Sequence, residues 1–75
     1  MDSQTFNRFN RALKVAIVDS RRTQRWIARR TRIDETRLSR IISCQAHPFP
    51  EEKRALARVL AKSEDELFGA GAEAV

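Results

Sequence analysis

Residues 23–43 read TQRWIARRTRIDETRLSRIIS, and the predicted fold is built around this stretch. It contains two short segments in which apolar residues recur at helical spacing, and no Gly or Pro interrupts it. Thr23 and Asp34 are good N-caps, so we expect one helix from Thr23 to about Arg30 and a second over residues 34–43. Residues 31–33 then form the turn between the two helices.

The second of these helices is expected to have two different faces. At 100° per residue, Leu38, Ile41 and Ile42 fall on one side and predict its contact with a core. The side chains outside this apolar stripe are polar or charged: Thr36, Arg40 and Ser43 lie opposite it, with Arg37 and Ser39 on its flanks. The helix therefore presents a polar face away from the core.

Helices are also expected on both sides of this unit. Asp2 and Ser3 are candidate N-caps for a helix to about Asp19, whose apolar stripe is Phe6, Phe9, Leu13, Ala16 and Ile17. Pro50 followed by two glutamates predicts the start of a fourth helix. Residues 63–66 form a capping box that opens a last short helix ending at Phe68. The sequence thus predicts a single all-α domain of five helices over residues 1–69, followed by a flexible tail over 70–75.

The charge is unevenly distributed along the chain. Fifteen Lys and Arg residues against ten Asp and Glu residues give a net charge of +5. Residues 1–43 carry eleven of the bases and four of the acids, whereas the remainder is slightly acidic. Twelve of the bases are arginine, which suits bidentate contacts with phosphate and guanine. One face of the domain is therefore expected to meet a polyanion.

Other classes of site find little support in the sequence. The single cysteine, Cys44, excludes an internal disulfide and fits a reducing compartment, and the longest apolar run, residues 15–18, is too short for a membrane span or a signal peptide. His47 is a lone loop histidine, so no metal site is expected there, and Cys44 is expected to be a small residue at the helix end and not a nucleophile. Trp26 is expected to pack between helices. We therefore expect a cytoplasmic protein with no enzymatic activity, metal, cofactor, small-molecule ligand or membrane contact.

Several residues match a known twenty-residue motif in register. From its first position, Gln24, the chain supplies the glutamine, the small residue and the apolar positions that the motif requires: Gln24, Ile27, Ala28, Ile33, Leu38 and Ile41. It departs from the motif at Thr31 and Arg32. With the Asp-Glu-Leu-Phe ending at Phe68, the chain resembles the phage Cro/cI-type, or lambda-repressor-like, helix-turn-helix DNA-binding domains. The resemblance implies that helices two and three are the helix-turn-helix.

The departures from the family pattern carry structural expectations. Arg32 stands where the turn normally has glycine, so a left-handed backbone is expected at a cost of about 1 kcal/mol. Cys44 stands where the recognition helix usually ends with glycine, and Arg22 replaces an apolar residue. Ile17 and Ile42 occupy positions that form a buried Arg–Glu pair in some members, and two isoleucines are an apolar replacement for it.

The resemblance also implies which residues meet double-stranded DNA. The base readers fall on Glu35, Thr36 and Arg40, with Arg37 and Ser39 as further candidates; Arg40 suits guanine, Glu35 a cytosine amino group and Thr36 a thymine methyl. The implied phosphate contacts are Thr23, Gln24, Arg21, Arg22, Arg25 and Ser43. Glu35 as a simple first-turn acid, and Arg37 and Arg40 as solvated surface, are the alternatives.

The implied function is a sequence-specific transcriptional regulator, a repressor that binds a palindromic operator as a homodimer. In relatives the dimer surface comes from the last helix and the following tail, here Leu67, Phe68 and residues 70–75; a place in the core is the alternative for Leu67 and Phe68. The alternatives are an antitoxin or restriction-controller DNA-binding protein, and a protein-interaction module that kept the fold without DNA binding. A basic membrane-surface protein is disfavoured, because the apolar stripes are needed for the core.

Overall fold

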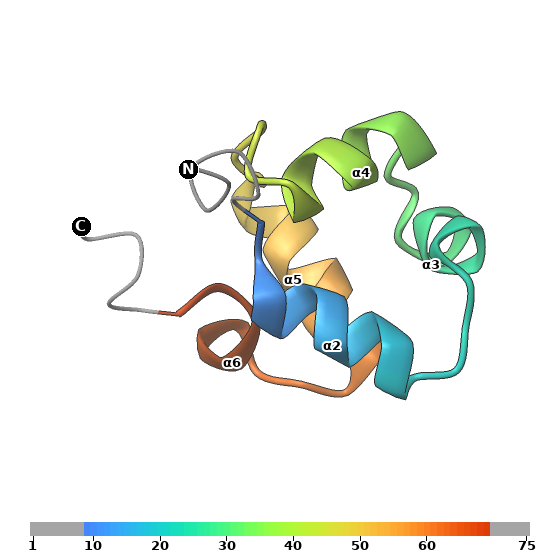
Figure 1. The fold of residues 1–75 in the computed structure, drawn as a ribbon, viewed down its shortest axis with the longest axis vertical. Coiled ribbons are helices and arrows are strands. Elements are labelled where there is room, and N and C mark those ends of the chain that lie inside the picture. The colour runs from blue at the N-terminus through green and yellow to red at the C-terminus, as the bar shows by residue number, and fades with distance from the viewer. Residues whose placement is uncertain (1–8, 70–75) are drawn as a thin grey trace, which may run out of the picture.

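The computed structural model describes residues 9–69, and this part of the chain is all-helical, without a strand (Figure 1). Its helices are α2 (Arg11–Asp19), α3 (Gln24–Thr31), α4 (Glu35–Ile42), α5 (Pro50–Leu60) and α6 (Glu64–Phe68). The all-α prediction is thereby confirmed. The predicted tail over 70–75 lies outside the described residues. Within 9–69, no helix combines the length and the apolar character that crossing a membrane requires.

The first described helix starts later than the sequence predicted. Asn10 is its N-cap, accepting a 3.0 Å hydrogen bond from the Leu13 amide, and residues 9 and 10 precede the helix. The predicted caps and Phe6 lie outside the described residues. Phe9 was expected in the core, but it lies ahead of the helix and is 43% exposed. The prediction of one helical stripe through Phe9 was therefore wrong.

Besides capping α2, Asn10 donates two hydrogen bonds to distant parts of the chain, and these fix where the helix starts. Its backbone N–H donates to the Ile42 carbonyl at the end of α4 over 2.6 Å. Its side-chain amide donates to the Leu67 carbonyl of α6 over 2.8 Å. One residue thus fixes the start of α2 against two other helices, satisfying carbonyls that a helix end leaves without intrahelical partners.

A single apolar core joins the described helices. α3 contacts α4 and α5, α2 contacts α4 and α6, and α5 contacts α6. Among residues 9–69 the buried side chains are all apolar: Leu13, Ala16, Ile17, Ile27, Ala28, Ile33, Leu38, Ile41, Ile42, Leu56, Ala57, Leu60 and Leu67. Ile17 and Ile42 are both in this cluster, as expected for an apolar replacement of a buried ion pair.

Short connections end the helices through left-handed residues. Arg32 ends α3 with φ 63°, and Cys44 follows α4 with φ 62°. Both residues stand at positions where the family pattern has glycine. The left-handed backbone expected at Arg32 is confirmed. The Ile33 amide donates to the Ala28 carbonyl over 3.0 Å, which closes the end of α3. Ile33 is buried, and the turn therefore also anchors α3 to the core.

The remaining helix starts agree with the predictions. Thr23 and Asp34 cap α3 and α4 by accepting from the amides of Trp26 and Thr36, each over 3.0 Å. Pro50 is the first residue of α5. The carboxylate of Glu66 accepts from the Ser63 amide over 2.8 Å, and this completes the capping box of α6.

Candidate nucleic-acid interface

α4 is held to the core by one face and exposes the other, as its sequence pattern predicted. Leu38 is fully buried, and Ile41 and Ile42 are buried beside it. Thr36, on the opposite side, is exposed. Figure 1 shows α4 across the top of the molecule, with α3 seen end-on at its right. The outward face of α4 and the start of α3 therefore meet at one surface.

Residues from both helices line an open hollow on this surface, here called the polar hollow. Its lining residues are Gln24, Glu35, Thr36, Ser39, Arg40, Ser43 and Gln45. All of these except Gln45 were predicted from the sequence to contact bases or phosphates. Arg40 gives the hollow a positive charge and Glu35 a negative one, while the other side chains are neutral hydrogen-bonding groups. The hollow can thus donate to and accept from a ligand with mixed polar edges.

Gln45 was missed by the sequence analysis because it lies beyond the end of α4, where a helical wheel does not place residues. Its amide donates to the Arg40 carbonyl over 2.7 Å, directly after the left-handed Cys44. This bond turns the chain back over the end of α4, where Gln45 joins the lining of the polar hollow. Ser43 is also tied locally, since its hydroxyl donates to the Ser39 carbonyl over 3.0 Å.

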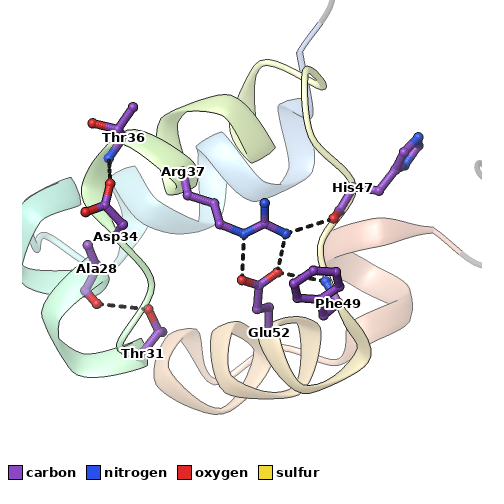
Figure 2. Close-up of polar contacts among 8 residues, drawn as sticks. All are labelled: Ala28, Thr31, Asp34, Thr36, Arg37, His47, Phe49 and Glu52. Atoms are coloured by element: carbon purple, nitrogen blue, oxygen red, sulfur yellow. Dashed lines mark hydrogen bonds and ion pairs between the residues drawn. The ribbon is translucent and has the colours of Figure 1, made fainter.

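Arg37, a predicted base reader, does not reach the polar hollow. Its guanidinium donates to the Glu52 carboxylate from Nε over 2.8 Å and from Nη2 over 2.9 Å, and also to the His47 carbonyl over 3.2 Å. It lies 4.6 Å from the centre of the Phe49 ring. Figure 2 shows the side chain reaching from α4 to α5. In this position Arg37 connects the two helices, and its Nε and Nη2 donors are occupied.

The geometry of this pair alters both ionisation equilibria. Hydrogen bonds from Arg37 lower the pKa of the Glu52 carboxyl below its ordinary value, although desolvation opposes the shift. The hydrogen bond with Glu52 raises the pKa of the Arg37 guanidinium. Glu52 also accepts from the Phe49 amide over 2.7 Å, at the start of α5. The charged form of Glu52 therefore holds both the start of α5 and the flank of α4.

Arg25 and Glu35 connect α3 to the start of α4 across the turn. Arg25 Nε lies 3.6 Å from Glu35 Oε1, and the two side chains are 75% and 51% exposed. An ion pair this exposed is strongly screened by water and salt. Arg25 was predicted to contact phosphate and Glu35 a base, and both remain accessible from solvent in this arrangement.

A second hollow lies on the turn side of α3 and contains arginines that the sequence analysis did not select. Its lining residues are Arg25, Ala28, Arg29, Arg32, Ile33, Asp34 and Glu35. Arg29 follows Arg25 by one helical turn, and Arg32 follows by a further three residues, so their spacing puts them on one face. That spacing was the signal available in the sequence.

The other predicted phosphate contacts lie around the start of α3. Arg22 lies 4.4 Å from the centre of the Trp26 ring, and Arg30 lies 5.2 Å from it. Trp26 is half-buried and packs against the core, as predicted. Arg21 has a left-handed backbone with φ 61° in the preceding connection. Arg21 and Arg22 are exposed and are adjacent in sequence to the N-cap Thr23.

No protein-family model, curated protein or solved structure matches this chain. The resemblance to Cro/cI-type domains thus stays a prediction from the residues that carry it. Within residues 9–69 there is no group of three or more His, Cys, Asp and Glu side chains placed to hold a metal ion. The absence of a cofactor and of catalytic activity stays a prediction.

Proposed function

We propose that this chain is a sequence-specific, double-stranded DNA-binding transcriptional regulator of the lambda-repressor-like kind. In this proposal α3 and α4 are a helix-turn-helix, and α4 enters the major groove of DNA in the cytoplasm. The observation that carries the proposal is the polar hollow, in which the outward side of α4 and the first residue of α3 converge. A major groove admits one helix, and the helix before it crosses the phosphate backbone.

The base-reading residues are proposed to be Arg40, Thr36, Ser39 and Glu35. Each is exposed and lines the polar hollow. Arg40 has the two parallel donors that guanine O6 and N7 accept, and the Thr36 methyl suits thymine. Arg37 is excluded from this set, because its guanidinium is bound to Glu52. Its contribution is to hold α4 in position.

The phosphate contacts are proposed to surround the start of α3. Gln24 is the first residue of that helix, and the positive end of the helix, where the Thr23 cap occupies only the Trp26 amide of the first turn, favours an anion. Thr23, Ser43, Arg21, Arg22 and Arg25 complete the predicted set. Arg29 and Arg32 join it here, because they share the second hollow with Arg25. Contacts of this kind increase affinity for every sequence and make it depend on salt.

The protein is proposed to act as a homodimeric repressor on a palindromic operator. One module of this size reads few base pairs, and two half-sites about one helical turn apart supply the missing affinity. Leu67, predicted as part of the dimer surface, is 2% exposed and belongs to the core. Phe68 also packs against the core, with the Lys53 ammonium 5.8 Å from its ring centre. The last helix therefore offers little apolar surface to a second copy.

The deciding experiment is a selection of bound duplexes from a random pool, followed by titration of the selected duplex and a scrambled duplex of equal composition. We expect a palindromic consensus and a selected duplex bound at least about a thousandfold more tightly at physiological salt. Equal affinity for both duplexes contradicts sequence-specific binding. Absence of binding to either duplex at low salt favours the protein-interaction module instead.

A further inference from the structure

The outward side of α2 carries apolar side chains that the core does not use. Val15 is 49% exposed and Val18 is 63% exposed, whereas Leu13, Ala16 and Ile17 of the same helix are buried. At 100° per residue, the two valines lie on either side of Arg11 and opposite the buried stripe. Placing two valines on the solvent side of a nine-residue helix gives the domain itself little stability.

The residues on this outward side are arranged symmetrically about Val15. Arg11 lies four residues before it and Asp19 four residues after it. Ala12 lies three residues before it and Val18 three residues after it. Consider an antiparallel pair of identical helices related by a two-fold axis at Val15. A residue that precedes Val15 in one copy then lies level with the residue that follows Val15 by the same number of positions in the other copy. Arg11 of each copy then meets Asp19 of the other, and Ala12 comes level with Val18.

A hollow beside this side of α2 provides further surface for a partner. It lies between α2 and α6 and is lined by Ala12, Val15, Ala16, Asp19, Lys62, Glu66 and Leu67. Its floor is apolar, while Lys62 and the two acids place both signs of charge around it. A second copy presents the same charges of both signs, so opposite charges can face each other across the interface.

We propose that a second copy of this chain docks antiparallel on α2, with Val15 at the two-fold axis and Arg11 paired with Asp19 of the other copy. This inference rests on the homodimer of the proposed function and names its surface. The residues of the polar hollow belong to α3, α4 and the loop after α4, so docking on α2 leaves them accessible. A helix of nine residues presents less than the roughly 800 Å² per partner of a standard interface, so free association is weak and DNA strengthens it.

Charge reversal on the full chain tests the pairing directly. Sedimentation equilibrium without DNA, over a series of protein concentrations, measures the dissociation constant of the dimer. Arg11→Glu or Asp19→Arg alone juxtaposes like charges twice in the symmetric dimer, and we expect dimerisation to weaken by about tenfold or more. The double variant R11E/D19R restores the opposite charges, and we expect dimerisation to return to within about twofold of the unmodified chain.

Matched variants separate the docking surface from general effects of charge. Lys14→Glu makes the same charge change on the flank of α2, and we expect no more than about a twofold effect on dimerisation. Val15 is exposed in the single copy, so Val15→Glu should leave the circular dichroism spectrum unchanged. We expect it to abolish dimerisation. A monomer at every concentration, or a double variant as weak as the single ones, overturns the proposed surface.

A half-site duplex makes the two proposals distinguishable. One copy suffices to bind a half-site, so Arg11→Glu is expected to bind it like the unmodified chain at matched salt, apart from the uniform loss expected when one positive charge is replaced by a negative one. Failure of the unmodified chain to bind any selected half-site contradicts the proposed function but not the surface. Half-site binding by a chain that never dimerises contradicts the homodimer and its surface, but not the proposed DNA binding.

Discussion

Arg37 of α4 and Glu52 of α5 form a two-point ion pair, with Nε 2.8 Å from Oε2 and Nη2 2.9 Å from Oε1. Two parallel hydrogen bonds fix orientation as well as distance. Arg37 lies one residue after Thr36 and three before Arg40, so the pair sets how α4 presents both to the polar hollow. The connection to α5 thus controls the position of the proposed reading face without belonging to it.

Removing the charge of Glu52 should destabilise the fold. Glu52→Gln loses the ion pair with Arg37 and weakens the cap on Phe49, and we expect the free energy of unfolding to fall by about 1 kcal/mol, since water partly screens the pair. Urea denaturation measures the loss. Glu51→Gln is the matched control, because that residue is exposed at the adjacent position, and its effect should stay within about 0.5 kcal/mol. Equal stability of the two variants would contradict the role of Glu52 in connecting α5 to α4.

The same pair should make stability depend on acid pH. The pKa of Glu52 is lowered in the folded chain, so its contribution is fully present above its ordinary value of 4.5 and is lost as pH falls through the lower folded value. We expect the stability difference between the unmodified chain and Glu52→Gln to be constant near neutral pH and to shrink in acid. Urea titrations at several pH values measure it. A stability difference that grows toward low pH would contradict a lowered pKa of Glu52 in the folded chain.

Arg40→Ala should relax sequence specificity. If Arg40 contacts guanine through two hydrogen bonds, its loss costs about 1–3 kcal/mol at one base pair of the selected operator and little on scrambled DNA. Fluorescence anisotropy with duplexes that vary that base pair measures the discrimination. A variant that loses the same affinity for every duplex would show that Arg40 binds the backbone instead.

Arg25→Ala should have the opposite signature. Arg25 is exposed beside Glu35 and lines the second hollow, and we propose a phosphate contact for it. Its loss should weaken binding to all duplexes alike and reduce the slope of log affinity against log salt by about 1. Titrations at several salt concentrations measure that slope. An unchanged slope excludes Arg25 from the phosphate contacts.

Arg32→Gly should stabilise the fold while weakening DNA binding. The left-handed backbone at φ 63° costs a non-glycine residue about 1 kcal/mol, and glycine relieves much of that cost. Arg29→Gly is the control, because it removes the same charge inside α3 and should destabilise by about 1 kcal/mol. Thermal or urea unfolding compares the two. A loss of stability in Arg32→Gly would mean that the Arg32 side chain makes stabilising contacts that outweigh the strain.

Local chemistry was sufficient to predict most of the helices. Thr23, Asp34, Pro50 and Ser63 are capping or first-turn residues whose effect is exerted within one helical turn, and the helices begin where these residues predict. The apolar spacing of α4 likewise separated its buried side from the side that lines the polar hollow. Such features depend only on neighbours in sequence.

Two features that local patterns did not reveal depend on contacts between distant residues. Asn10 begins α2 because Ile42 and Leu67 accept its hydrogen bonds, which no local pattern reveals. Arg37 lies at the flank of α4, and its angle on a wheel does not show that Glu52, fifteen residues later, holds its guanidinium. The predicted resemblance to Cro/cI-type domains implies roles for residues but does not supply these pairs.

The Trp26 indole, close to Arg22 and Arg30, gives the molecule an intrinsic optical reporter. It is the only tryptophan of the chain, and the Arg22 guanidinium lies 4.4 Å from its ring centre. A nearby cation shifts the emission of an indole, and a polyanion that draws Arg22 away from the ring removes that influence. Occupancy of the edge of α3 that we propose to contact the DNA backbone can therefore be followed by the wavelength and intensity of intrinsic fluorescence, without attaching a dye to so small a protein.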